Sequence, residues 1–195
     1  MPITIGSKQG ADFSDPIGLL SDCHRRIESF LGVLVTLAVQ AEGAALETDQ
    51  RVALETSLRY FRLAAPRHTL DEEESLFPRL LDSNDPRVQP VFSSLQKLSA
   101  DHRVAEERHR QVDELANRWL SDGALSVEDS GRLRNVLAEL TDFYAAHIAV
   151  EEQQVFPLAG KVLAPSALEL IGSEMAGRRG VALKAPGENP SASES

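Results

Sequence analysis

The sequence predicts an all-α protein, an antiparallel up-and-down four-helix bundle followed by a short fifth helix and a mobile tail. Apolar residues recur at steps of three and four along four long stretches, which is typical of helices with one buried face. No stretch alternates polar and apolar residues over the length of a strand. The chain also repeats one helical hairpin, because the histidines at 24 and 68 are 44 residues apart and those at 102 and 147 are 45 apart.

The first helix is predicted from Pro16 to about Ala41. Asp15 offers an N-cap acceptor, and proline is favoured at the first helical position. Residues 30–39 are apolar on all sides, so we expect this end of the helix to be covered twice: once by the bundle, and once by the C-terminal helix or a second subunit.

The second helix is expected to begin at a cap formed by Thr48 or Asp49. Pro66 lies inside it and predicts a kink or a helix restart, because proline lacks the N–H that an interior position donates. Pro78 is expected to end the helix or to bend it again, ahead of a turn at residues 82–86.

The third helix is predicted from Pro86 or Pro90 to about Leu120, and the fourth begins after a capping sequence at 126–129. A fifth helix is expected over about 165–175. The predicted organisation is an N-terminal arm (1–14), one bundle domain (15–176) and a flexible tail (177–195) that is rich in Gly, Pro, Ser and Glu.

Composition excludes several classes of protein. The net charge of −10 argues against nucleic acid or an anionic membrane as partner, because both bind clustered Lys and Arg. A single cysteine, Cys23, excludes an internal disulfide and fits a reducing compartment. The N-terminus has no apolar signal-like core, and no apolar run reaches the roughly 20 residues that cross a bilayer. We therefore expect a cytoplasmic protein.

One string, HxxxEExxxFP, occurs twice in the chain, from His68 to Pro78 and from His147 to Pro157. On a helix, residues four apart lie on one face, so each copy can direct an imidazole and a carboxylate at one point. Imidazole suits iron, zinc, copper and nickel, and carboxylates bridge pairs of cations in helical bundles. The alternative is that each histidine and its glutamate form an ordinary pair on the surface of a charged helix, without a metal.

A further histidine precedes each copy, His24 in Leu20–Arg25 and His102 in Leu98–Arg103, with leucine and serine in the same register. Both histidines fall on predicted apolar stripes, where an unliganded imidazole would be a costly buried polar group. The spacing therefore favours a metal site inside the bundle. The remaining alternative is a scaffold that binds zinc or nothing.

In this order, His24, His68-x-x-x-Glu72, His102 and His147-x-x-x-Glu151, the sequence resembles the hemerythrin-like (HHE cation-binding) family over roughly Asp15–Leu158. The resemblance implies a non-haem centre of two iron ions, with Glu72 and Glu151 as the bridging carboxylates. The metal ligands that it implies are His24, His68, Glu72, His102, His147 and Glu151.

The oxygen-carrying members of that family have a fifth histidine ligand one turn after the third-helix histidine, where this chain has Glu106. His109 is one turn further, ~10 Å along the axis from His102, and is expected to be solvated or to pack between helices. Glu28 and Glu106 are interpreted as partners of metal-bound imidazoles or occasional ligands. Tyr144 either lines the pocket or is a core aromatic.

Glu73 and Glu152 follow the two carboxylates directly and are expected to be solvated charges or to lie just outside the ligands. Cys23, beside His24, is expected to be a small buried residue without reactivity.

The predicted function is binding of O₂ or a related small oxidant, peroxide or nitric oxide, in a dry and narrow pocket of diatomic size. One alternative is a di-iron enzyme that consumes peroxide or nitric oxide, which the carboxylate-rich ligand set favours. Another is an iron- or oxygen-responsive regulatory or interaction module. A homodimer through the first or the fifth helix is a further expectation.

Overall fold

The computed structural model describes residues 11–182, and every regular element among them is a helix. The all-α class is therefore confirmed for this part of the chain. Residues 1–10 of the predicted arm and 183–195 of the predicted tail lie outside the described residues.

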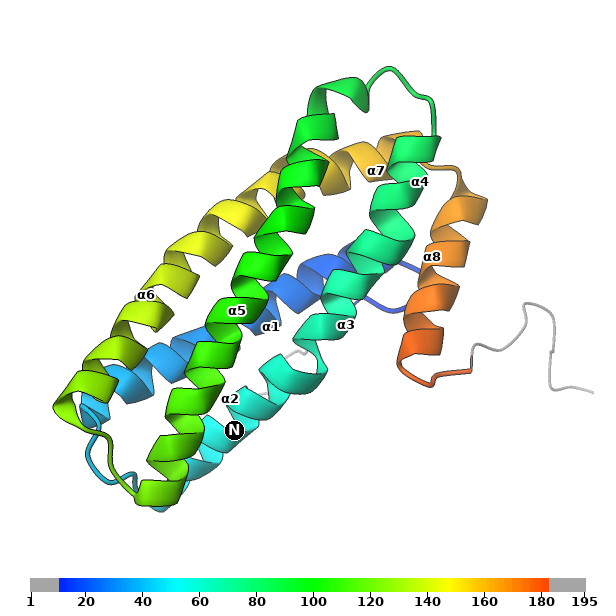
Figure 1. Ribbon diagram of the computed structural model, residues 1–195. Coiled ribbons are helices and arrows are strands. Elements are labelled where there is room, and N and C mark those ends of the chain that lie inside the picture. Colours follow the sequence, from blue (N-terminus) through cyan, green and yellow to red (C-terminus); the bar gives the residue numbers. More distant parts are fainter. Residues whose placement is uncertain (1–10, 183–195) are drawn as a thin grey trace, which may run out of the picture.

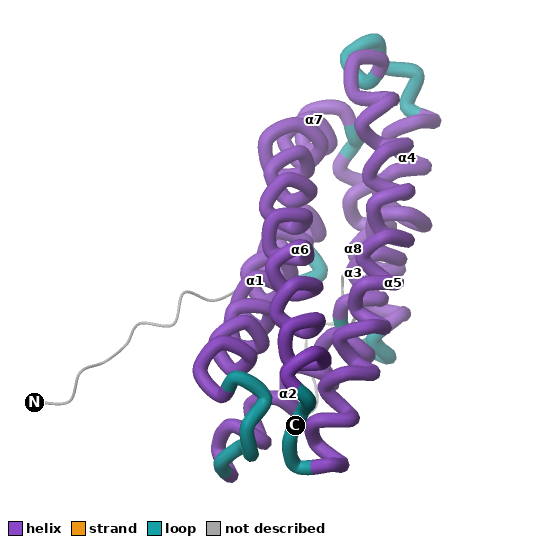
Figure 2. Tube along the Cα trace, turned by 60° about the vertical axis from the view of Figure 1, so that its left-hand side comes forward, coloured by secondary structure: helices purple, strands orange, loops and turns teal. Residues whose placement is uncertain are grey.

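Four long helical stretches lie side by side along the molecule (Figures 1 and 2). The first, α1, spans Pro16–Ala41, and it packs against both α2 (Thr48–Leu63) and α6 (Val127–Val150). The long helix α5 (Phe92–Asp122), preceded by one 3₁₀ turn, η2 (Gln89–Val91), packs against α6 and α2. These contacts close a helical bundle around one interior.

Two of the four stretches are composite. After α2 the helical path continues through α3 (Ala65–Leu70), the π-helical segment η1 (Asp71–Leu76) and α4 (Phe77–Asp82). After α6 it continues through a second π-helical segment, η3 (Glu151–Val155), and α7 (Phe156–Val162). The last helix, α8 (Pro165–Arg178), packs against α1 and η1.

The helix caps follow the predicted chemistry in two of three cases. The Asp15 side chain accepts from the Gly18 N–H at 3.0 Å, and Ser126 accepts from the Asp129 N–H at 3.0 Å, as expected. The predicted cap of α2 was wrong, because Glu47 takes that position and its N–H donates to the Gln50 side chain at 3.0 Å. A glutamine at the third helical position can reach back in this way.

The prolines act differently from each other. Pro66 marks a restart, since α2 ends at Leu63 and α3 begins at Ala65. Pro78 does not end the helix; it sits at the start of α4, directly after η1, and Pro157 has the same place after η3. In η1 the Phe77 N–H donates to the Glu72 carbonyl, five residues back. This wider turn accommodates a proline, which has no N–H and whose ring crowds an α-helical carbonyl.

The core has two apolar parts with a polar layer between them. One part joins α1, α2, α5 and α6 around Trp119, and the other joins the N-terminal half of α1 to α4, α7 and α8. On α1, His24 lies between Leu20 of the second part and Ile27 of the first. The predicted site residues therefore occupy the level at which the two parts meet.

Two expectations about α1 and α8 need correction. The apolar run at residues 30–39 is not covered by α8, which packs at the level of Leu19 and Leu20, and Val39 is 56% exposed. The fifth helix, expected over about 165–175, is also longer than predicted, because α8 extends to Arg178. Arg178 and Arg179 form ion pairs with the buried Asp71 at 2.9 and 2.7 Å. None of the helices within residues 11–182 combines the length and the apolar character that a bilayer crossing requires.

Candidate metal centre

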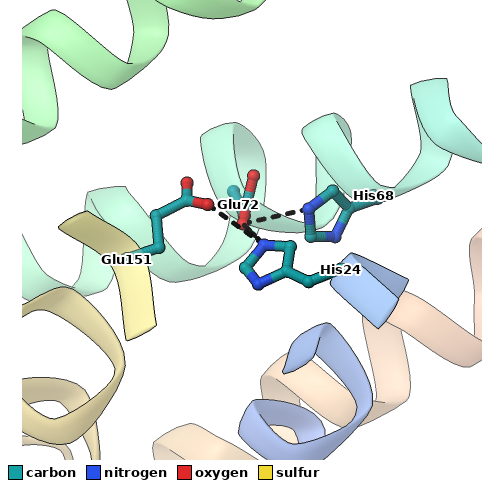
Figure 3. A group of neighbouring side chains, drawn as sticks. All are labelled: His24, His68, Glu72 and Glu151. Carbon is teal, nitrogen blue, oxygen red and sulfur yellow. Dashed lines mark ion pairs between the residues drawn. The ribbon is translucent and has the colours of Figure 1, made fainter. Parts of the chain in front are cut away.

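The six residues implied as ligands come from six helical segments and meet in the polar layer. They are His24 on α1, His68 on α3, Glu72 on η1, His102 on α5, His147 on α6 and Glu151 on η3. They form two overlapping groups that share both glutamates, and within each group one ligand-capable atom per residue lies within 4.8 Å of the others. One of the two groups is drawn in Figure 3.

The first group contains His24 and His68. The His68 Nε2 atom lies 3.4 Å from Glu72 Oε1, and the His24 Nε2 atom lies 3.1 Å from Glu151 Oε2 and 3.9 Å from Glu72 Oε1. Figure 3 shows both imidazoles turned toward the two carboxylates.

The second group contains His102 and His147. The His102 Nε2 atom lies 3.3 Å from Glu72 Oε2, and the His147 Nε2 atom lies 3.2 Å from Glu151 Oε1. Each glutamate thus offers one oxygen to each group. This is the arrangement that a carboxylate needs in order to join two cations.

The second glutamate of each motif holds a histidine of the other hairpin. Glu152 Oε1 lies 2.8 Å from His24 Nδ1 and Glu73 Oε1 lies 2.8 Å from His102 Nδ1, so the Nε2 atom of each ring is left facing the centre. Such partners determine which ring nitrogen is free to bind a metal. Glu28 and Glu106, the expected partners, are exposed side chains instead.

The phenylalanine of each motif also crosses to the other hairpin. Phe156 stacks on His24 with ring centroids 5.3 Å apart, and Phe77 stacks on His102 at 6.3 Å. No role for these rings was predicted from the sequence. Their repetition at one position in both copies was the available signal.

The chemistry of the buried atoms fits a pair of cations. Of the described residues, only these six carry buried side-chain nitrogen or oxygen atoms without a hydrogen-bond partner. Both oxygens of Glu72 and of Glu151 and the Nε2 atoms of His24 and His102 are among them, whereas the unpaired atom of His68 and of His147 is Nδ1 rather than the Nε2 atom that approaches a glutamate. Both glutamates have no exposed surface. Buried polar atoms are normally paired because desolvation is costly, so a cluster of unpaired acceptors calls for a cation.

The electrostatics of the cluster point the same way. Burial, together with the nearby Glu151, raises the pKa of Glu72 well above its usual range. Burial opposes the charge on Glu151 as well, but hydrogen bonds from His147 and His24 outweigh it and lower its pKa. For His24, the carboxylates overcome burial and raise the pKa to about 9. Two carboxylates in contact in the interior thus require compensating positive charge.

A cavity of about 360 Å³ adjoins the centre on the side of the histidines, and all four of them line it. The expected narrow pocket of diatomic size is therefore wrong in its dimensions. Tyr144 lines this cavity and is also part of the core, and its hydroxyl lies 2.8 Å from His109 Nε2. Burial lowers the pKa of His109 to about 4, so this ring is neutral near pH 7. It packs between helices and is outside both ligand groups.

Comparison with known proteins agrees with this site. Residues 15–159 match the model of the family described as the hemerythrin HHE cation binding domain. A protein of Haemophilus influenzae (strain ATCC 51907 / DSM 11121 / KW20 / Rd), named only "Uncharacterized protein", is 26% identical over 175 residues, which cover 89% of this chain and 95% of that protein. The family match spans most of the chain and both ligand groups, so this protein belongs to the hemerythrin HHE cation-binding domain family.

Proposed function

We propose that this protein is a non-haem di-iron protein that binds O₂ or a related small oxidant, such as peroxide or nitric oxide, inside its helical bundle. The observation that carries the proposal is the set of unpaired buried atoms on Glu72, Glu151, His24 and His102, namely both oxygens of each carboxylate and the Nε2 atom of each imidazole. The Nε2 atoms of His68 and His147 lie 3.4 and 3.2 Å from the same carboxylates. In this proposal His24 and His68 hold one iron, His102 and His147 hold the other, and the two glutamates bridge them.

Bound iron would supply redox chemistry that the protein's own side chains lack. The protein's contribution is orientation and exclusion of water. Glu152 and Glu73 orient two of the imidazoles through their Nδ1 atoms. Ile27 and Ile148, which are 2% and 8% exposed, line the cavity beside the histidines and make that part of its wall apolar.

A second candidate is an enzyme that consumes peroxide or nitric oxide. The observation in its favour is the Tyr144 hydroxyl, which lines the cavity beside the histidines and is paired with His109. Reduction of either oxidant takes up protons, and a hydroxyl within hydrogen-bond reach of a neutral imidazole can pass one on.

The first experiment is metal analysis of protein purified from iron-supplied cells, with visible spectra recorded anaerobically, then with O₂, then with peroxide. Two irons per chain and a spectrum that changes with oxidant support the proposal. Loss of oxidant on repeated addition, measured with an oxygen or peroxide electrode, favours the enzyme. Zinc, or no metal, together with a spectrum that does not respond would contradict both candidates.

The bridging assignment is tested by the double variant Glu72→Ala/Glu151→Ala. We expect a helical protein that no longer holds two metals per chain. The matched control is Glu28→Ala/Glu106→Ala, which removes two exposed carboxylates from the same bundle and should keep the full metal content. Retention of two metals in the first variant would refute the bridging role.

We also propose the antiparallel up-and-down order of the four long stretches, which the short links between successive stretches support, and a homodimer through α1 or α8. Exposed apolar side chains on both helices, Val39 and Leu170, each 56% exposed, support the dimer. Light scattering of the purified protein tests it, and a monomeric mass at high micromolar concentration would contradict it.

A further inference from the structure

The cavity beside the candidate centre is much larger than a two-atom oxidant requires. Its volume of about 360 Å³ lies within the range of small-molecule sites, roughly 300–1,000 Å³. Its walls are mainly apolar, and its opening to the surface lies near the exposed side chains of Leu70, Arg103 and Glu106. An apolar cavity with few polar groups is the usual form of a site for an organic molecule.

The cavity arises where the two hairpins differ. Tyr144 stands three residues before His147, but the residue three before His68 is Ala65. Likewise Ile27 follows His24 by three residues, but Ala105 follows His102 by three. All four of these residues line the cavity, so each large side chain of one hairpin corresponds to a small one in the other. The break between α2 and α3 lies at the same wall, next to Pro66.

Tyr144 brings a hydroxyl to the wall of this cavity, in addition to the histidines and the charged side chains that line it. The Tyr144 hydroxyl pairs with His109 Nε2 at 2.8 Å, and Phe61 stacks on the His109 ring at 4.3 Å and holds it in place. A hydroxyl both donates and accepts, so the bond to His109 leaves Tyr144 with hydrogen-bonding capacity toward the cavity. A ligand with its own hydroxyl can therefore either donate a hydrogen bond to Tyr144 or accept one from it.

The charges around the cavity indicate the kind of ligand. Glu73 and Glu106 line it together with Arg103, so the side chains outside the histidine cluster bring two carboxylates and one guanidinium. This excess of negative over positive charge disfavours an organic anion. The apolar walls disfavour a strongly hydrated cation.

We propose that this cavity is a binding site for a small uncharged organic molecule, of the size of a single-ring phenol, whose hydroxyl meets Tyr144. The inference goes beyond the proposed function, because that function requires only a diatomic or peroxide ligand. It uses residues that lie outside both ligand groups.

The test uses 4-fluorophenol as the probe and the full-length protein as purified, observed by ¹⁹F NMR. We expect saturable binding that unlabelled phenol displaces and that 4-fluorobenzoate does not show. Absence of saturable binding, or equal binding of the benzoate, would overturn the proposal.

Two variants locate the probe. Ala65→Phe fills the space that the first hairpin leaves open and should abolish binding. Its matched control, Ala145→Phe, adds the same ring at an exposed position of α6 that does not line the cavity, and should bind as the unmodified protein does. Probe binding that survives Ala65→Phe would show that the probe sits elsewhere.

A third variant covers the case in which Ala65→Phe does not fold, as judged by circular dichroism. Tyr144→Phe removes only the hydroxyl and should weaken binding about 3- to 10-fold, the effect of one hydrogen bond. Unchanged affinity in Tyr144→Phe would refute the assigned polar contact. Because the readout is the probe rather than iron or oxidant, a protein with two irons that binds no phenol would contradict this inference alone.

Discussion

At the scale of single residues, the second glutamate of each motif has a role that the first cannot have. Glu152 and Glu73 are partly exposed, and each contacts the Nδ1 atom of a histidine from the other hairpin. We predict that Glu152→Gln/Glu73→Gln lowers metal affinity about 10- to 100-fold, since partners of this kind orient the ligand and raise its basicity. Competition with a chromogenic chelator measures the change.

The control for this prediction is Glu28→Gln/Glu106→Gln. These glutamates lie one turn after the same two histidines but are exposed, so their replacement should leave metal affinity unchanged. If the control variant lost affinity and the Glu152/Glu73 variant did not, the assignment of partners would have to be reversed.

His109 belongs to the same scale, and its burial makes stability depend on pH. Its pKa is about 4 in the folded chain, against about 6.5 for a free imidazole, so between these values only the unfolded chain takes up the proton. Stability from this residue is complete above pH 6.5 and is lost as the pH falls toward 4, by at most on the order of 3 kcal/mol.

His109→Gln should therefore flatten the loss of stability between pH 6.5 and 4. Urea unfolding of both proteins at several pH values measures the difference. An identical pH dependence of the two proteins would show that His109 is not held neutral.

At the scale of elements, α8 is attached to the π-helical segment that carries Glu72. Asp71, with no exposed surface, pairs with Arg178 and Arg179, which are themselves only 17% and 19% exposed. At the corresponding position of the other hairpin, directly before Glu151, stands Val150, which needs no such partners.

We predict that Arg178→Ala/Arg179→Ala lowers the free energy of unfolding by about 3–5 kcal/mol, because it leaves a buried carboxylate without a counter-charge. Asp71→Val should cost less, since Arg178 keeps its ion pair with Glu74 and both arginines can reach water. Chemical denaturation compares the variants, and a larger loss in Asp71→Val would contradict this order.

At the scale of the whole molecule, the six candidate ligands are brought together only by the complete bundle. They span residues 24 to 151 and come from both hairpins. A cation that binds this site therefore binds the folded chain alone. At a free metal concentration about 100 times the dissociation constant, it should stabilise the fold by about 2.7 kcal/mol.

Thermal and urea unfolding of chelator-treated protein, with and without added ferrous iron or zinc, test this linkage. The stabilisation should disappear in Glu72→Ala/Glu151→Ala. A gain of equal size in that variant would place the bound cation outside the bundle.

The helical class, the bounds of α1 and the repetition of the hairpin follow from the amino-acid sequence alone. These features depend on local periodicity, on caps such as Asp15 and on a motif that occurs twice. Spacing of four along a helix placed His68 with Glu72 and His147 with Glu151, because residues four apart share a face whatever surrounds them. His24 and His102 were expected beside them from their place on apolar stripes and from the family resemblance.

The features that depend on contacts between the hairpins became visible only in the folded structure. It assigned Glu152 and Phe156 to His24, and Glu73 and Phe77 to His102, through pairings that cross from one copy to the other. It likewise attached Arg178 and Arg179 to Asp71 and opened the cavity between Ala65, Ala105 and Tyr144. The physical reason is that periodicity along one helix specifies which face is buried, whereas the side chains that meet across the core are set by how the helices pack against each other.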